Sequence, residues 1–266
     1  MKQKNLLITF DYELFLGRRS GRPEDCMLHP TDLLRSILSH FKVKAVFFAD
    51  TTYLCKLAEL APHHKQCAED LDHISAQILQ LVDDGHYVLP HIHPHWLDAV
   101  YSSTLREFDL SNITRYRFHQ LSLAERDAVF SSSVEILQNI IHPKHPDYRI
   151  NGFRAGGWSL QPFADFKPCF EKHGIVYDMS VVKGLYQFSN AQVYDYSDTP
   201  DKPVYRFAQD VSVENGEGPF VEICGTLIRV SQMVDYIDRA HKKVLNVVGF
   251  DRDYGKGIGQ QSMEIK

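Results

Sequence analysis

Short apolar runs alternate along this chain with segments of helical periodicity, and this alternation limits the folds open to it. The runs that we predict as strands cover residues 6–10, 43–49, 87–89, 150–154, 176–178, 220–223 and 244–248. One predicted helix begins at residue 31, after a loop over 17–30, and others cover 52–61, 71–84, 122–141, 160–173 and 232–241. Such alternation favours an α/β fold of parallel βα units, in which active sites lie at the carboxyl ends of the strands.

The chain is long enough, at 266 residues, to bury a sizeable core as one large domain. No linker or internal repeat divides it, so we predict a single domain over residues 1–266, with a flexible tail from about residue 251. Residues 186–203 have no regular pattern, and we expect them to be irregular.

Composition excludes several classes of protein. A net charge of −5 gives no electrostatic reason to expect a nucleic-acid partner. No apolar run approaches the roughly 20 residues that span a bilayer, and none has the form of a signal peptide, so we predict a cytoplasmic protein. The five cysteines are scattered without Cys-x-x-Cys spacing, which argues against a disulfide framework and a thiolate zinc site.

Two acids, Asp11 and Glu13, follow the first apolar run. Side chains alternate across a strand, so both acids would share one face while Tyr12 takes the other. Two carboxylates on one face are costly without a cation or a shared proton. A metal bound by one of them would leave the other to act as a base, although exposed acids after a strand are the simpler interpretation of this pair alone.

Three histidines, His91, His93 and His95, follow the third predicted strand within five residues. Imidazoles at this density suit a divalent metal. In a helical turn His91 and His95 would share a face with His93 offset, whereas in an extended segment all three would share one. Pro90 and Pro94 disfavour a regular helix and favour a stiff loop.

A third cluster follows the strand at residues 150–154. Arg154 could pair with Asp11 and keep it ionised, and Gly156 and Gly157 would let the backbone approach a ligand closely. Trp158 offers a flat face for a sugar ring, but a core tryptophan beside a tight turn is equally consistent with the sequence.

These clusters, in this order and spacing, resemble the polysaccharide deacetylase superfamily (NodB homology, carbohydrate esterase 4). Residues 9–11 match its Thr-Phe-Asp motif, and residues 85–95 match its Gly-His…His-x-x-x-His motif. Residues 153–158 are similar to its arginine motif, and residues 46–48 to the Phe-Phe strand between the first two. The variants around the first two motifs are most similar to a WbmS-like bacterial branch associated with surface polysaccharides.

The resemblance implies a distorted (β/α)7 barrel that binds one divalent metal, often zinc, and hydrolyses acetyl groups on sugars. It implies that Asp11 is the general base and that Arg154 is its partner. His91 and His95 would be metal ligands, with Glu13 as the candidate third ligand.

Two departures from the family pattern affect these roles. Tyr12 stands where a metal-binding aspartate is usual, and Glu13 one residue later would replace it. The family's C-terminal histidine, its general acid, is replaced by Phe250, and no histidine follows His241. His93 is one candidate for the proton donor.

The sequence therefore predicts a metal-dependent hydrolase that removes an acyl group from a surface-polysaccharide sugar. A sugar substrate predicts an open groove lined by Trp96 and Trp158, whereas a small non-sugar amide predicts a closed pocket. A carbohydrate-binding protein that has lost catalysis is the alternative of a different class.

Overall fold

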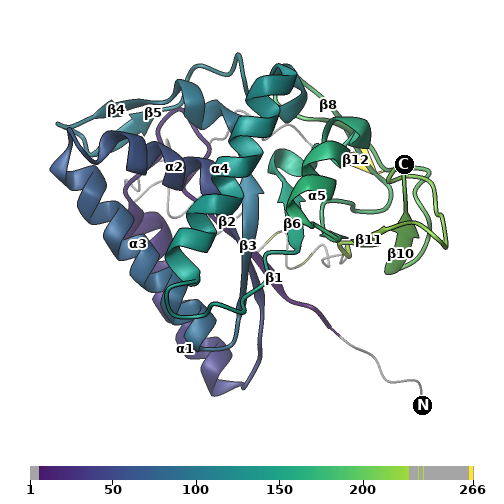
Figure 1. Cartoon of the computed structure of the whole chain (residues 1–266), viewed down its shortest axis with the longest axis horizontal. Coiled ribbons are helices and arrows are strands. Elements are labelled where there is room, and N and C mark those ends of the chain that lie inside the picture. The colour runs from purple at the N-terminus through teal and green to yellow at the C-terminus, as the bar shows by residue number, and fades with distance from the viewer. Residues whose placement is uncertain (1–5, 228–232, 234–235, 237–263, 266) are drawn as a thin grey trace.

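The computed structural model describes residues 6–227, 233, 236 and 264–265 (Figure 1). The strands are β1 (Thr9–Tyr12), β2 (Val46–Asp50), β3 (Tyr87–Ile92), β4 (Val100–Ser102), β5 (Glu107–Asp109), β6 (Gly152–Ala155), β7 (Tyr177–Asp178), β8 (Leu185–Phe188), β9 (Val193–Asp195), β10 (Val204–Phe207), β11 (Phe220–Ile223) and β12 (Glu264–Ile265). The α-helices are α1 (His29–His40), α2 (Thr51–Leu60), α3 (Lys65–Asp83), α4 (Leu123–Ile141) and α5 (Lys167–His173). Short π or 3₁₀ turns are η1 (Glu24–Leu28), η2 (Pro94–Asp98), η3 (Phe118–Gln120), η4 (Gly156–Trp158) and η5 (Phe163–Asp165).

One seven-stranded sheet organises the molecule, in the order β1-β2-β3-β6-β7-β11-β10. Every neighbouring pair is parallel except β10 with β11, which is antiparallel. The predicted α/β fold with parallel strands is therefore confirmed. In the described part of the chain no ladder joins β1 to β10, so closure into the expected (β/α)7 barrel is not shown.

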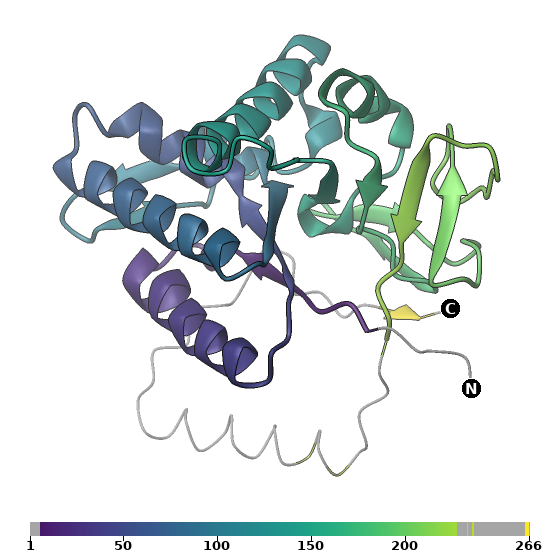
Figure 2. The same ribbon diagram turned by 60° about the horizontal axis from the view of Figure 1, so that its bottom comes forward.

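Helices α2, α3 and α4 pack against β3, and α5 packs against α4 farther along the sheet (Figure 1). Strands β10 and β11 lie at the end of the molecule opposite α1 and α3 (Figure 2). Aromatic rings fill the layer between helices and sheet, where Phe130 of α4 contacts Phe153 of β6 and Phe170 of α5. This layer fixes β6 against its helices and therefore fixes the residues at the end of β6.

Several boundaries differ from those predicted. The first helix follows η1 directly and begins at His29, because Pro30 is tolerated in a first helical turn. The helix predicted from residue 160 begins only at Lys167, since Pro162 cannot sit inside a helix whereas Pro168 can occupy its first turn. The stretch 186–203, expected to be irregular, contains the antiparallel pair β8–β9.

The hairpin β4–β5 and the strand β10 were not anticipated. The predicted helix over 232–241, the strand over 244–248 and the tail from about 251 lie outside the described residues, and the single domain over 1–266 stays a prediction. Among the helices described, none is both long and apolar enough to cross a bilayer. All five cysteines are free thiols.

Truncating a ring of the aromatic layer should destabilise the fold strongly. Phe130 has no exposed surface, so we expect Phe130→Ala to lower the free energy of unfolding by about 3–5 kcal/mol through lost burial and a cavity. Leu123→Ala in the same helix is the control, because Leu123 is 79% exposed and its loss should cost little. Urea unfolding of both variants measures this difference, and equal losses would contradict the described packing.

Candidate metal centre

Strand β1 directs its side chains as the alternation predicts. The hydroxyl of Tyr12 is buried and donates to Gln77 Oε1 on α3, at 2.8 Å. Asp11 pairs instead with Arg154, and Glu13, just beyond the strand, contacts His91 and His93. The two acids therefore serve the site while Tyr12 anchors β1 to the helix layer.

The end of β3 decides which histidines meet Glu13. The chain is extended from His91 to His93, so these two side chains, two residues apart, reach the same carboxylate. Pro94 then begins η2, and the extended alternation stops before His95. A turn beginning at Pro94 thus separates His95 from the other two histidines.

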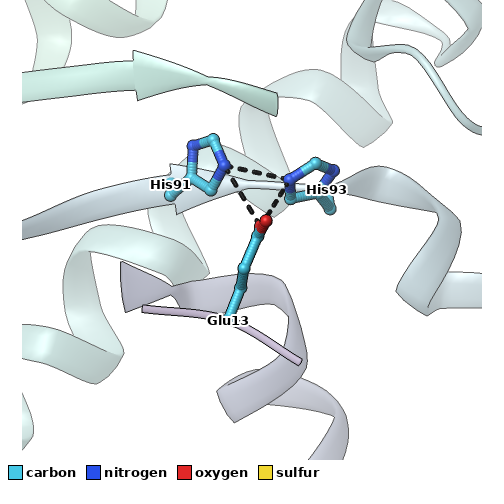
Figure 3. Close-up of side chains that lie close together, drawn as sticks. All are labelled: Glu13, His91 and His93. Carbon is cyan, nitrogen blue, oxygen red and sulfur yellow. Dashed lines mark hydrogen bonds and ion pairs between the residues drawn. The ribbon is translucent and has the colours of Figure 1, made fainter. Parts of the chain in front are cut away.

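Glu13, His91 and His93 converge on one point (Figure 3). Glu13 Oε2 lies 3.0 Å from His93 Nε2 and 3.4 Å from His91 Nε2, and the two Nε2 atoms lie 2.9 Å apart. Both imidazoles are buried. Among the described residues this is the one group of His, Cys, Asp and Glu side chains whose geometry suits a metal ion.

A backbone carbonyl orients His91. His91 Nδ1 lies 2.9 Å from the carbonyl oxygen of Arg154, and because a carbonyl only accepts, Nδ1 carries the hydrogen. In neutral His91 the lone pair therefore lies on Nε2, which faces Glu13 and His93, as a metal ligand requires. Register supports this contact, since His91 and Arg154 are partners on neighbouring parallel strands.

The electrostatics of the cluster are those of closely coupled opposite charges. Burial favours neutral His91, but the carboxylates of Asp11 and Glu13 outweigh it and raise the His91 pKa to about 9. Burial also opposes ionised Glu13, yet the charges and hydrogen bonds of His93 and His91 bring its pKa below its ordinary value. The cluster thus favours a carboxylate beside a positive charge.

Arg154 joins β1 to β6 and to the end of β7. Its Nη1 donates to Asp11 Oδ1 at 2.7 Å, its Nη2 to Thr9 Oγ1 at 2.8 Å, and its Nε to the carbonyl of Met179 at 3.0 Å. The guanidinium also lies over the ring of Phe48, 4.1 Å from its centroid. The predicted partnership of Asp11 and Arg154 is therefore present in the structure.

The glycines after β6 have separate roles. A Cβ on Gly156 would lie 2.2 Å from the carbonyl oxygen of Ile92 and 2.9 Å from His93 Nδ1, so only glycine lets this turn pass so close to His93. Gly157 has φ +57°, and its carbonyl accepts from Gln192 Nε2 at 3.2 Å. Trp158, expected to stack on a sugar, is partly buried, and its carbonyl accepts from the hydroxyl of Tyr196.

His95 and Trp96 belong to a buried unit beside the cluster. The His95 ring stacks on Tyr116, with centroids 4.9 Å apart, and neither of its nitrogens has a hydrogen-bond partner among the described residues. Burial lowers the His95 pKa well below its usual value, so the ring is neutral. Trp96 is fully buried and donates to Asp50, so the face expected to line an open groove is covered.

The donor set fits a divalent metal. Two imidazole nitrogens and a carboxylate oxygen are ligands suited to zinc, iron, manganese, cobalt or nickel. Ligand atoms of a tetrahedral zinc site with bonds of about 2.0–2.1 Å lie about 3.3 Å apart, close to the separations of 2.9, 3.0 and 3.4 Å here. Two Nε2 lone pairs at 2.9 Å also need a proton or a cation between them.

Sequence reasoning missed two buried acids near Arg154, namely Asp178 on β7 and Glu222 on β11. Both lay in predicted strands. Glu222 interrupts the otherwise apolar run Phe220-Val221-Glu222-Ile223, and a carboxyl in a buried strand was the available signal.

Comparisons with known proteins add little at the level of sequence: no family model matches the chain, and no curated protein matches it. A crystal structure from Mycobacterium smegmatis, provisionally described as a polysaccharide deacetylase, matches 91% of this chain and 72% of its own. Its sequence identity is 14% and its TM-score is 0.43. The description of this protein names the same family that the sequence motifs resemble, but the match is too distant to transfer an activity.

Replacing Gly156 should disturb the cluster through His93. In Gly156→Ala the new Cβ must displace the Ile92 carbonyl or the His93 ring, so we expect zinc affinity to fall at least tenfold, about 1.4 kcal/mol. Gly216→Ala is the matched control, because a Cβ there meets nothing within 4 Å. Competition with a zinc chelator measures both variants, and unchanged affinity in Gly156→Ala would contradict the described approach to His93.

Exchanging single histidines separates the two possible ligand sets. If Glu13, His91 and His93 hold the metal, His93→Ala should weaken zinc binding about 100-fold or more, whereas His95→Phe should keep one equivalent. Phenylalanine preserves the ring stacked on Tyr116. Elemental analysis of the two purified proteins, without a histidine tag, distinguishes the sets. Loss of metal only in His95→Phe would restore the Glu13, His91, His95 set.

Proposed function

We propose that this protein is a metal-dependent hydrolase that removes an acyl group, an acetyl group in the simplest case, from an amide or ester on a sugar. The observation that carries the proposal is the convergence of Glu13, His91 and His93 beside the Asp11–Arg154 pair at the carboxyl ends of parallel strands. Motif resemblance supplies the sugar and a bacterial surface polysaccharide or its precursor as the substrate class.

Glu13, His91 and His93 would hold one divalent metal, for which zinc is the first candidate. When bound, such a metal lowers the pKa of water toward about 7 and polarises an acyl carbonyl. His91 is kept in the ligand tautomer by the carbonyl of Arg154. Gly156 leaves the space that the His93 ring occupies.

Asp11 is the general base of this proposal. It is the more exposed member of its ion pair, with 30% of its side chain accessible against 11% for Arg154. One face of Asp11 can therefore accept the proton of an attacking water while Arg154 holds the other. Arg154 also gives Asp11 a charged hydrogen-bond donor, which holds its carboxyl in one orientation.

The proton donor to the leaving group is a separate question. His93, the candidate from sequence, has Nε2 directed at Glu13 and His91, so we assign it to the metal site. The segment around Phe250, where the family places a histidine, lies outside the described residues.

A small non-sugar amide is the second candidate substrate, and one observation favours it. Trp96 is fully buried and cannot line an open groove, so Trp158 remains of the two aromatic residues expected to contact a sugar. Comparing turnover of N-acetyl and O-acetyl sugars with that of small amides such as N-acetylated amines distinguishes the two. Acetate release from sugars alone would support the sugar proposal.

Removing the negative charge of Asp11 should stop turnover without removing the metal. We expect Asp11→Asn to keep one equivalent of metal and to lose about 10²–10⁴-fold in kcat, the usual contribution of a general base. Asp201→Asn, at an exposed position, is the control and should leave kcat unchanged. Acetate release under saturating metal is the measurement, and retained turnover in Asp11→Asn would exclude this assignment of the base.

A further inference from the structure

Two acids lie side by side inside the sheet, behind Arg154. Asp178 on β7 and Glu222 on β11 are register partners on neighbouring parallel strands, and neither has any exposed surface. Arg154 is a cation that acts on Asp178, and no salt bridge among the described residues contains either acid. Two ionised carboxylates in such a place would repel strongly in a medium of low dielectric.

The hydrogen bonds around the pair require a proton. Glu222 Oε1 accepts from the backbone N–H of Val181 at 3.1 Å, but Glu222 Oε2 is buried without a donor among the described residues. The two carboxyls belong to register partners, and carboxylate oxygens can share a hydrogen bond only when one of them is protonated. A proton on Glu222 Oε2 would turn this atom into a hydrogen-bond donor. It would also remove the repulsion between two ionised carboxylates.

Asp178 is suited to be the ionised partner. Its two oxygens accept from the backbone N–H of Ser180 at 2.8 Å and from the Ser180 hydroxyl at 3.1 Å. Among the described residues, Glu222 accepts a single hydrogen bond, from the N–H of Val181. Burial and the charge of Asp178 raise the Glu222 pKa well above its usual value, while burial raises that of Asp178 only to about 6.

The same short segment holds Arg154. The carbonyl of Met179, between Asp178 and Ser180, accepts from Arg154 Nε at 3.0 Å. The Ser180 hydroxyl also accepts from the N–H of Ala155, the residue after Arg154, at 2.9 Å. Whatever fixes residues 178–180 therefore fixes the direction in which Arg154 extends toward Asp11.

We propose that Glu222 is a positioning residue that stays protonated and donates a hydrogen bond to Asp178. The pair then carries one negative charge and holds residues 178–180 against Arg154. Arg154 is thereby directed at Asp11. The consequence for catalysis rests on the function proposed above, whereas the protonation of the pair does not.

Other titratable groups around the pair do not supply its proton. Tyr196, Tyr205 and Cys224 interact with one or both acids, and burial raises the pKa of each of these three groups, so they are neutral near pH 7. Arg154 is the cation that acts on Asp178, and Lys183 acts on the neighbouring Cys224.

The first experiment compares the wild type with Glu222→Gln, whose amide imitates a neutral acid that donates a hydrogen bond. A carboxyl with a raised pKa in the fold binds a proton that the unfolded chain has released above about pH 4.3. The wild type therefore loses stability relative to Glu222→Gln as pH rises, by up to tenfold in the unfolding constant for each pH unit. Urea unfolding between pH 5 and pH 7 measures this ratio. Glu217→Gln, at an exposed position, should show no such trend.

Infrared spectroscopy detects the proton directly. At pH 7 the wild type and Glu217→Gln should show the C=O stretch of a buried protonated carboxyl, and Glu222→Gln should lose it. A ratio of unfolding constants that does not change with pH, or the absence of this band in the wild type, would overturn the proposal. Both measurements hold even if the protein has no hydrolase activity.

Kinetics test the positioning role once a substrate is found. Glu222→Gln should keep kcat within about twofold, whereas Glu222→Met, of similar size but without a donor, should lower kcat about tenfold with little change in KM. Equal losses in both variants would show that an ionised Glu222 is needed and would overturn the proposal. If both variants kept the kcat of the wild type, the hydrogen bond to Asp178 would not position Arg154, and this outcome would also overturn the proposal.

Discussion

Arg154 is the residue on which the geometry of the site depends most. Its guanidinium binds Asp11 and Thr9 of β1 and the carbonyl of Met179 after β7, so it ties together strands that are not neighbours in the sheet. Its own carbonyl fixes the tautomer of His91 on β3. One residue therefore sets both the direction of the candidate base and the lone pair of a candidate metal ligand. A lysine could not make these contacts, because it lacks the planar fork of donors.

The surroundings of Arg154 are rigid for a reason that lies away from the chemistry. Phe153, the preceding residue, is buried against rings of α4 and α5, and β6 pairs with β3 on one side and β7 on the other. Side chains held by such packing lose little further entropy when they bind a ligand. The close turn at Gly156 extends this order to His93. The aromatic layer thus determines the positions of groups that it does not touch.

The sequence predicted the parallel sheet, because alternation is a local feature. It also predicted the pairing of Asp11 with Arg154, because both residues lie at the ends of predicted strands, and such ends gather at one edge of a parallel sheet. It left open which histidines act together, since that depends on where β3 ends, and Pro94 ends the extended segment one residue after His93. The burial of Trp96 was not predictable either, because its partner Asp50 lies 46 residues away in the chain. Glu222 was missed for the same reason, since its neighbour Asp178 becomes visible only when β7 pairs with β11.

Charge balance connects the metal cluster with the buried acid pair. Arg154 forms an ion pair with Asp11 and also acts on Asp178. A single proton on the Asp178–Glu222 pair limits the negative charge near the guanidinium to two carboxylates. In the cluster, Glu13 is balanced by His91, whose pKa of about 9 keeps it protonated at neutral pH when no metal is bound. A divalent cation must displace that proton, because a ligand nitrogen needs its lone pair. Protonation thus has opposite consequences at the two places. The proton on the Asp178–Glu222 pair helps to hold Arg154, whereas the proton on His91 competes with a metal for the same nitrogen.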